Sequence, residues 1–250
     1  MKRPVKYFVV DAFTESAFKG NQAAVCFLEE DHERDDSWLQ SLAAEFELPL
    51  TCFLIPITGS DCLHPRRFHL RWFTSKAEMD ICGHGTLASA HTLFSNGLVG
   101  SSETVEFTTN SGILTAKRVD DCEAKGSFLI EVNFPVITTC EYSSNDFSMF
   151  SKALNGATIV DVVLSSWESV AELQPRTDEI MKCPGKVMIV TAAAPEGSTY
   201  DFGSRLFAPK LGLNEASRRS GELKVHYDKE KQRVLLTGKA VTVMNGCVLV

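Results

Sequence analysis

The chain has 250 residues, of which 44% are hydrophobic, enough for the core of one large domain or of two lobes of about 120 residues. Its net charge of -7 and its pI near 5.4 argue against a nucleic-acid surface. No apolar run approaches the roughly 20 residues that cross a bilayer, and the N-terminus shows no signal-peptide pattern. Eight scattered cysteines, with no C-x-x-C pair and no zinc spacing, indicate reduced thiols. We expect a cytoplasmic protein with no metal, no cofactor, and no nucleic-acid or membrane partner.

The first half of the chain alternates predicted strands with two predicted helices. Apolar and β-branched runs predict the strands. The first helix begins at an N-cap at Asp36-Ser37, presents an apolar stripe, and ends at Pro49. The second follows the turn described below. The predicted strands are residues 6–13, 21–28, 51–57, 104–109, 112–118 and 126–134.

The second half is also a mixture of strands and short helices. A weak helix is predicted over residues 144–151, with a stop at Asn155-Gly156, and a short helical connector over 178–183. Strands are predicted over 158–164 and 186–194. The tail, residues 221–250, has the pattern of a three-strand meander. The fold class is therefore α+β.

The stretch from Arg71 to Phe94 holds the most informative turn of the chain. A strand-like start leads to residues 82–85 (Cys-Gly-His-Gly), and then to apolar residues at helical spacing up to Asn96-Gly97. The turn delivers a thiol and an imidazole to a helix N-terminus, where backbone N–H groups and the helix dipole favour an anion. We expect a site for a small carboxylate, and a lowered pKa for the Cys82 thiol.

Two short runs of sequence occur twice. In the first copy, the end of the first run and the second run are 35 positions apart, from Lys76 to Ser111. In the second copy they are 10 positions apart, from Lys210 to Ser220. The halves therefore read as two copies of one design, the second of them shortened. The matched runs are residues 71–76 with 205–210 and residues 110–114 with 219–223.

The shorter copy lacks about 25 residues, which in the first copy include the turn and its helix. About four or five large apolar side chains would be lost with that helix, each worth about 1.5–3 kcal/mol on burial. The total, roughly 6–15 kcal/mol, matches the stability of a typical domain. The sequence thus predicts an N-terminal lobe over residues 1–120 and a C-terminal lobe over 121–250, shortened between Lys210 and Ser220. We expect the second lobe to be poorly packed, incomplete in solution or covered by a partner.

Three longer stretches resemble one known family. They are residues 9–25 (VVDAFTESAFKGNQAAV), 70–90 (LRWFTSKAEMDICGHGTLASA) and 201–210 (DFGSRLFAPK). With these residues the chain is identified as a member of the phenazine-biosynthesis isomerase-like (PhzF-like) family, within the diaminopimelate epimerase-like superfamily, over essentially its whole length. The resemblance implies two similar α+β lobes, each a curved, mostly antiparallel sheet around a central helix, with the ligand between them. In this chain the second lobe would lack its central helix.

The resemblance implies a cofactor-independent proton shift in a small carboxylic acid, as part of a biosynthetic process. Such chemistry needs a positioned base of tuned pKa and donors aimed at the developing charge. Relatives supply an Asn and a Gly-His turn from the first lobe, which match Asn21, Gly83 and His84, with Gly85 following. They place a Glu base in an N-L-S-E-T-like motif, where this chain has Leu50. A leucine cannot accept a proton.

Relatives also carry a D-P-[VT]-x-G-S-A-H-like motif in the second lobe. This chain passes from Asn214-Glu215 directly to residues 216–218 (Ala-Ser-Arg), so the motif falls inside the gap found from the repeat. In the epimerase relatives one thiol from each lobe transfers a proton. Cys82 matches the first thiol, and the second would lie in the missing segment.

Each candidate residue also has a structural alternative. Cys82 is either a catalytic thiol or a small core residue, and His84 is either a ligand contact or a helix cap. Asn21 either contacts ligand or braces a strand turn, as Asp11 does. Glu47 either replaces the lost base or lies at a solvated helix end.

The leading prediction is a family isomerase for a small carboxylate whose activity is weak or lost. The alternative from another class is a non-catalytic protein that keeps the fold for ligand binding or subunit association, such as a homodimer. A truncated splice or gene-model product explains the gap equally well. The two defects favour a non-catalytic chain. The predicted site comprises Cys82 and His84 as catalytic residues and Asn21, Gly83 and Gly85 as substrate-binding residues.

Overall fold

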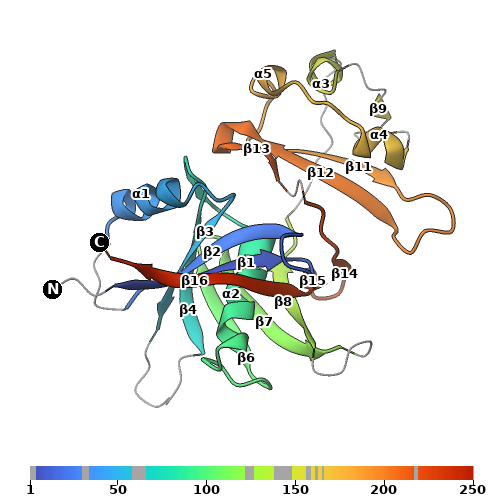
Figure 1. Ribbon diagram of the computed structural model, residues 1–250. Helices are drawn as coiled ribbons and strands as arrows, with labels where there is room; N and C mark the ends of the chain where they lie inside the picture. Colours follow the sequence, from blue (N-terminus) through green and yellow to red (C-terminus); the bar gives the residue numbers. More distant parts are fainter. Residues whose placement is uncertain are drawn as a thin grey trace. The chain divides into compact units, whose positions relative to one another are not determined.

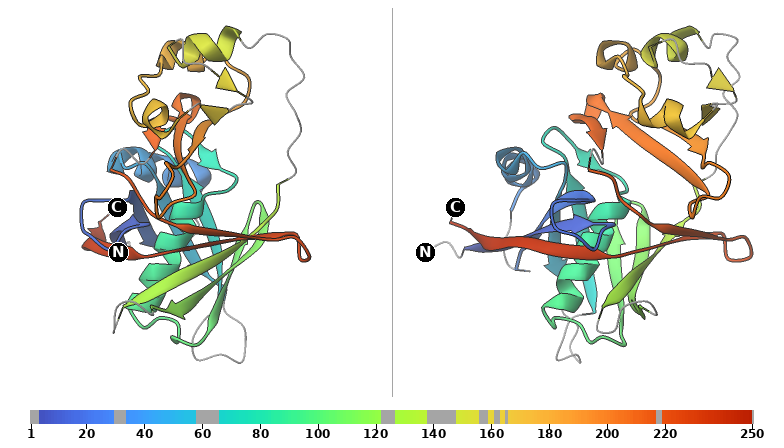
Figure 2. Two further views of the ribbon diagram at one scale, coloured as in Figure 1. Left: turned by 90° about the vertical axis from the view of Figure 1, so that its right-hand side faces the viewer. Right: turned by 45° about the vertical axis from the view of Figure 1, so that its right-hand side comes forward.

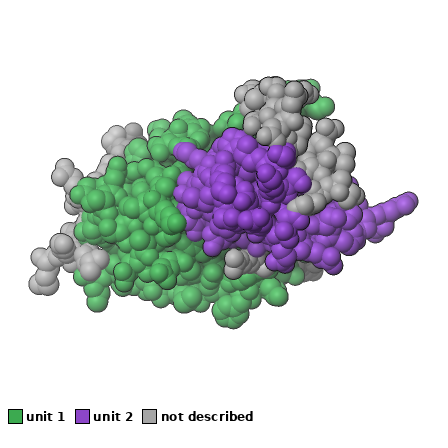
Figure 3. Space-filling view, turned by 90° about the horizontal axis from the view of Figure 1, so that it is seen from above, with its two compact units in different colours: residues 1–137, 218–250 green, residues 138–217 purple. Residues whose placement is uncertain are grey.

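The computed structural model describes residues 4–29, 34–57, 66–121, 127–137, 148–155, 159–160, 163–164, 166–216 and 219–249. The chain forms two compact units: unit 1 comprises Met1–Ile137 and Arg218–Val250, and unit 2 comprises Thr138–Ser217 (Figure 3). These units differ from the lobes predicted over residues 1–120 and 121–250. The difference arises because the C-terminal strands pair with strands of the N-terminal half.

The described part of unit 1 is built on an 11-stranded sheet with the order β14-β15-β8-β7-β6-β4-β3-β2-β1-β16, and β5 pairs with β4. The pairs β2/β3 and β4/β6 are parallel and the other pairs are antiparallel. The strands are β1 (Val5–Ala12), β2 (Asn21–Phe27), β3 (Thr51–Pro56), β4 (Arg67–Phe73), β5 (Glu78–Met79), β6 (Thr104–Thr109), β7 (Gly112–Asp120), β8 (Phe128–Pro135), β14 (Lys224–Asp228), β15 (Arg233–Gly238) and β16 (Ala240–Val248).

The sheet of unit 1 is curled. Only Lys239 separates β15 from β16 in the chain, yet these strands lie near opposite ends of the strand order. The sheet therefore bends round until its ends approach, and Figures 1 and 2 show it wrapped around a helix. The predicted three-strand meander over residues 221–250 is wrong. Although β14 and β15 form a hairpin, β16 pairs with β1.

The enclosed helix is α2 (Gly83–Ser95), which confirms the helix predicted after the Cys-Gly-His-Gly turn. All ten of its residues from Gly85 to Phe94 are buried, as expected of a helix with protein on every side. Helix α1 (Asp36–Phe46), whose N-cap is Asp35 rather than the predicted Asp36, packs on the outer face of the sheet. Successive side chains of β3 point to opposite faces of the sheet. Cys52 therefore packs in the core around α2, and Phe53 packs in the core under α1.

The described part of unit 2 contains a five-stranded sheet with the order β13-β12-β11-β10-β9. Its helices α3, α4 and α5 have six, five and four residues. Residue 126, residues 144–147 and residues 156, 158, 161 and 162 of the predicted elements lie outside the described residues. The elements of unit 2 are α3 (Ser148–Ala153), β9 (Ile159–Val160), β10 (Val163–Leu164), α4 (Trp167–Ala171), α5 (Thr177–Ile180), β11 (Met188–Ala193), β12 (Phe202–Ala208), η1 (Pro209–Leu211) and β13 (Leu213–Ala216).

The two units share an order of strand pairing. The series β1-β2-β3-β4 is paired antiparallel, parallel and antiparallel, and β9-β10-β11-β12 has the same sequence of pairings. The repeated Arg-x-Phe runs also make the same contacts. Arg71 lies over the ring of Phe73 and pairs with Glu78 at 2.7 Å. Correspondingly, Arg205 lies over Phe207 and pairs with Glu215 at 2.6 Å.

The matched sheets differ in what covers one face. When residues 71–73 are aligned with residues 205–207, Trp72 corresponds to Leu206. The cross-strand pair Cys52–Trp72 then corresponds to the pair Ile189–Leu206. In unit 1 that face lies against α2, and Cys52 and Trp72 are 0% and 1% exposed. In unit 2 the same face is open, with Ile189 and Phe202 both 52% exposed. The opposite face of the unit 2 sheet is packed, and Val190, Ala192 and Phe207 lie in its core.

Two features are absent from the described residues. Among them, no helix has both the length and the hydropathy to cross a bilayer. They also hold no group of three or more His, Cys, Asp or Glu side chains placed to bind a metal ion.

Candidate functional site

The first turn of α2 places Cys82 at the N-cap, in extended backbone conformation and with no side-chain cap hydrogen bond. The Thr86 hydroxyl donates to the Cys82 carbonyl at 2.6 Å, which fixes the turn. The backbone N–H groups of His84 and Gly85 lie near enough to the Cys82 sulfur to lower the pKa of its thiol, although neither makes a cap hydrogen bond of standard geometry. The thiol, and not a polar cap, therefore lies over the positive end of the helix.

Burial determines the charge state of this turn. It raises the pKa of the Cys82 thiol to about 12, because desolvation outweighs the effect of the Gly85 and His84 backbone N–H groups, which lowers it. The predicted lowering of this pKa is therefore wrong, since a helix N-terminus activates a thiol only where the thiolate keeps some solvation. Burial also lowers the pKa of His84 to about 4, against a smaller opposing effect of the Gln22 backbone. At neutral pH the turn holds a thiol and a neutral imidazole.

The side chains of Cys82 and His84 contact each other. Cys82 Sγ lies 3.3 Å from His84 Nδ1. Since both groups are neutral, the imidazole tautomer decides which of them donates: where the thiol donates to Nδ1, the imidazole proton is on Nε2. In the described part of the chain, the buried Nε2 has no hydrogen-bond partner of standard geometry, and the Gln22 backbone is a neighbour of the His84 ring.

Glycines bring strands against the turn. A Cβ atom at Gly85 would lie 2.3 Å from Leu50 Cδ2 and 2.8 Å from Trp72 Cδ1. The helix therefore packs directly on β3 and β4, and any side chain at position 85 would collide with them. At Gly83 a Cβ atom would lie 3.1 Å from Leu236 Cδ1. The C-terminal strand β15 therefore also borders the turn.

Leu50 lies beside the first turn of α2, at the position where the resemblance places a Glu base. Its side chain is 1% exposed and belongs to the α2 core. The fold places position 50 next to Gly85. A carboxylate would reach the start of α2 from there, whereas Leu50 supplies only apolar surface.

Asn21 begins β2, opposite Ala12 of β1. The turn before it requires Gly20, which has φ +63°, because a Cβ atom there would lie 2.2 Å from the Ala12 carbonyl oxygen. The Asn21 amide oxygen lies 3.2 Å from where a Cβ atom of Gly221 would stand. Its neighbour Gln22 reaches His84 through the backbone. The start of β2 and the start of α2 are therefore neighbours, as the site prediction requires.

Asp11 has the bracing role that the sequence suggests. Its buried carboxylate accepts from Phe18 N at 2.7 Å and from Arg219 Nη2 at 2.6 Å. It ties the loop between β1 and β2 to the segment that precedes β14. Asp11 is thus a structural residue of this end of the sheet.

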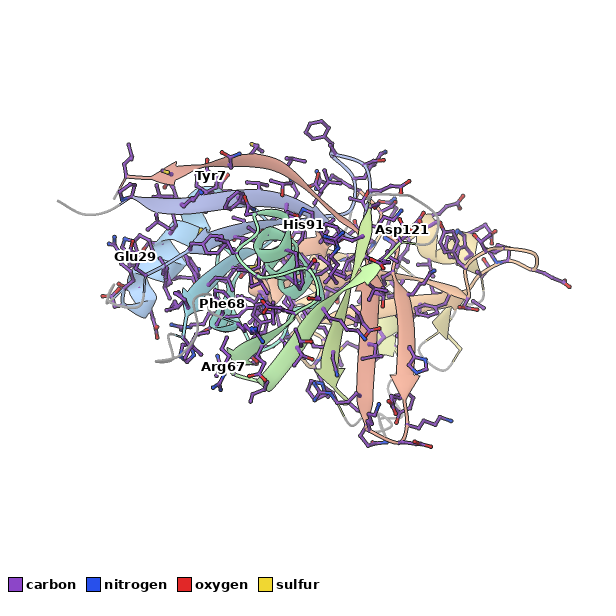
Figure 4. The ribbon with its side chains drawn as sticks, turned by 90° about the horizontal axis from the view of Figure 1, so that it is seen from below. Tyr7, Glu29, Arg67, Phe68, His91 and Asp121 are labelled. Atoms are coloured by element: carbon purple, nitrogen blue, oxygen red, sulfur yellow. The ribbon has the colours of Figure 1, made fainter. Side chains whose placement is uncertain are left out.

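Glu47, Glu78 and His91 have structural roles. Glu47 is an exposed helix C-cap with φ +51°, so it does not replace the base. Glu78 is held by Arg71. Figure 4 shows His91 on α2 inside the curled sheet, where its ring stacks on Phe128 and its Nε2 lies 3.2 Å from Thr242 Oγ1. His91 is therefore a packing residue of the α2 core.

Three neighbours of the turn were not predicted, namely Gln22, Cys52 and Leu236. Cys52 donates to the Gly85 carbonyl at 3.5 Å, and burial raises the pKa of its thiol well above the usual value. Alternation along β3 places Cys52 on the same face as Leu54, so this position was within reach of the sequence pattern. Leu236 lies far away in the sequence and follows only from the pairing of β15 with β8.

A family model described as "Phenazine biosynthesis-like protein" matches residues 10–217. An uncharacterized isomerase of Halalkalibacterium halodurans is 33% identical, and the alignment covers 97% of each chain. The "Phenazine biosynthesis-like domain-containing protein 1" of Mus musculus is also 33% identical, with 98% of this chain and 99% of the mouse protein covered. The alignment with the bacterial isomerase has 281 positions, more than the 250 residues present here. Part of that relative therefore faces gaps in this chain.

Solved structures give the same result. The PhzF family protein of Enterococcus faecalis has a TM-score of 0.78 and 28% identity, covering 99% of this chain and 100% of that one. A hydroxyproline epimerase from Agrobacterium vitis, solved with trans-4-hydroxy-L-proline, has a TM-score of 0.54 and 10% identity, covering 99% of this chain and 93% of that one. This second likeness concerns the fold alone. From the family match, the two relatives and the Enterococcus structure it follows that this chain belongs to the phenazine biosynthesis-like (PhzF) family of isomerase-related proteins.

Proposed function

We propose that the turn at the start of α2 binds the carboxylate of a small organic acid, and that the chain has little or no isomerase activity. The observation that carries the first part is the neutral His84 imidazole beside a helix N-terminus, whose buried Nε2 has no hydrogen-bond partner of standard geometry among the described residues. Asn21 would add an amide donor from β2. The distant fold relative solved with an amino acid supports a carboxylate as the ligand class.

The loss of activity follows from the groups present at the turn. A general base works best when its pKa lies near the operating pH. The Cys82 thiol, with a pKa of about 12, is almost entirely protonated at pH 7, and the His84 imidazole, with a pKa of about 4, is a weak base. Leu50 occupies the place of the family's Glu and has no titratable group. Proton abstraction from carbon therefore has no suitable acceptor in the described part of this turn.

A second defect lies in unit 2. In unit 1, 33 positions separate the Arg-bound Glu78 from Ser111, and this span contains α2 and β6. In unit 2, five positions separate the Arg-bound Glu215 from Ser220. The span that would hold the counterpart of α2 is absent, and the sheet face that this helix would cover is open at Ile189 and Phe202. We infer that the second half of the family's two-part site is missing.

We therefore favour a non-catalytic ligand-binding protein over an active isomerase. The catalytic alternative assigns Cys82 and His84 as the proton-transfer pair and Asn21, Gly83 and Gly85 as the substrate-binding set. It requires a ligand to resolvate Cys82 and lower its pKa. The two alternatives differ in whether bound acid exchanges its carbon-bound proton.

The test is an NMR titration of the labelled chain with a panel of cyclic 2-amino and 3-hydroxy acids. We expect the amide signals of Gly83, His84 and Gly85 to move in a saturable way. His84→Ala should weaken the binding roughly tenfold, the effect of losing one hydrogen bond to a charged group. His69→Ala, at an exposed position of β4, is the matched control and should bind normally. If the amide signals of the turn do not move on addition of any acid, this carboxylate site is ruled out. The same holds if His84→Ala binds the acid as tightly as the parent chain does.

A further inference from the structure

Strand β14 is an edge strand with an unusually open environment. Among the described residues it has one strand neighbour, β15, and it closes one end of the large sheet. Its residues from Lys224 to Tyr227 are all exposed, so neither face of the strand is covered. A long or apolar edge of this kind offers unpaired N–H and C=O groups to another chain.

The apolar side chains of β14 continue a face that is buried further along the sheet. Val225 and Tyr227 pair across the ladder with Leu236 and Val234, which in turn pair with Val132 and Phe134 of β8. Val132 and Phe134 are 0% and 5% exposed in the α2 core, whereas Val225 and Tyr227 are 47% and 46% exposed. The core face therefore extends past its covering helix and ends in open apolar surface.

The sequence of β14 is complementary to itself. In an antiparallel pairing centred on His226, Lys224 of one copy faces Asp228 of the other, and Val225 faces Tyr227. Each contact occurs twice about the twofold axis, as an isologous interface requires. Oppositely charged pairs and aromatic pairs with β-branched residues are the cross-strand combinations that stabilise antiparallel strands. Shifting the register by one residue would place Lys224 opposite Tyr227 and lose this complementarity.

We propose that two copies of this chain associate through β14, edge to edge and antiparallel in the register centred on His226, to form one sheet that continues across the dimer. The two Val225–Tyr227 pairs would form a four-residue apolar cluster on the face that Leu236 shares. The two Lys224–Asp228 pairs would flank His226 on the other face. The partner is a second copy because the charge pattern matches itself, and the proposal does not depend on a ligand at α2.

The test is sedimentation equilibrium of the full chain over a dilution series. A monomer–dimer equilibrium is expected. Val225→Lys should raise the dissociation constant at least roughly tenfold, because it places a charge in the apolar cluster. Lys224→Glu should act in the same direction, because it faces Asp228 of the other copy, and Lys224→Arg should not. Asp228 is left unchanged, since it also caps the turn to β15 by accepting from Lys231 N.

Met244→Lys provides the matched control, because Met244 is an apolar residue of similar exposure, 52%, on the other edge strand, β16. This variant should dimerise like the parent chain. Hydrogen exchange of the parent chain gives a measurement that does not depend on the folding of a variant, since amides of β14 should exchange more slowly as concentration rises. A monomer at all concentrations, open-ended aggregation, exchange in β14 that is independent of concentration, or dissociation by Met244→Lys would each overturn the proposal.

Discussion

The inner sheet face of unit 1 and its counterpart in unit 2 have the same strand pairing and very different environments. In unit 1 the pair Cys52–Trp72 is sealed by α2. In unit 2 the matched pair Ile189–Leu206 lies on an open face, although the strands and the Arg205–Phe207 contact are retained. Strand pairing and packing on the outer face are thus enough to place these strands. The central helix supplies the second core and begins with the turn that we propose as a ligand site.

The largest expected effect is a difference in the stability lost at two matched positions, Trp72 in unit 1 and Leu206 in unit 2. Trp72→Ala should lower the free energy of unfolding by about 3–5 kcal/mol, because it removes a buried aromatic ring and leaves a cavity under α2. Leu206→Ala, at the matched position of unit 2, should cost about 1 kcal/mol or less. Urea denaturation of both variants measures the difference. Equal losses would mean that the unit 2 face is covered in solution.

The tight approach of α2 to β3 gives the second prediction. Gly85→Val should destabilise unit 1 by about 3 kcal/mol, because the new side chain would collide with Leu50 and Trp72. Gly100→Ala is the control, since the added Cβ would meet only the flexible side chain of Glu103 at 3.2 Å. Thermal unfolding of both variants checks this. A Gly85→Val protein as stable as the control would show that the helix can move away from the sheet.

The pH dependence of stability gives the third prediction. Burial lowers the pKa of His91 to about 4 in the folded chain, below the usual 6.5. The unfolded state therefore binds more protons, so this stability is complete above pH 6.5 and is lost as pH falls towards 4. His91→Gln should reduce the slope of stability against pH in that window by up to about 1.4 kcal/mol per pH unit. An unchanged slope in His91→Gln would refute the assignment.

The smallest expected effect lies on the open face of unit 2. Phe202→Ser should change stability by no more than about 0.5 kcal/mol, because the side chain is half exposed. It should also reduce the binding of a hydrophobic dye, since it removes part of an exposed apolar face. A loss of several kcal/mol would show that this face is buried against another part of the chain or a partner.

Local patterns predicted the elements around the site well. The helix α2 was predicted because its apolar spacing and its Asn96-Gly97 stop are signals within one segment. The strands up to β8, apart from the two-residue β5, were found for the same reason. The pairing of β16 with β1 was missed, because a meander and a return to the far edge have the same local pattern. The unit boundary was missed with it, since it depends on that long-range pairing.

The chemistry of the turn was only partly predictable. The sequence placed a thiol and an imidazole at a helix N-terminus, and the structure brings Cys82 and His84 within 3.3 Å of each other. The direction of the Cys82 pKa shift was wrong because the helix N-terminus can be recognised locally, whereas desolvation depends on what the rest of the sheet encloses. The resemblance matches Leu50 to the family's Glu, and the fold adds that position 50 lies against Gly85.

Carbon-proton exchange is the most direct test of the central claim, that the turn binds a carboxylate but lacks a base and the second half of its site. The chain is incubated in deuterated water with each cyclic acid that shifts the Gly83–Gly85 amide signals, and deuterium incorporation is followed by NMR. The account predicts binding without incorporation, both in the parent chain and in Leu50→Glu, which restores only one of the two missing parts. Incorporation by the parent chain that disappears in Cys82→Ala would contradict it.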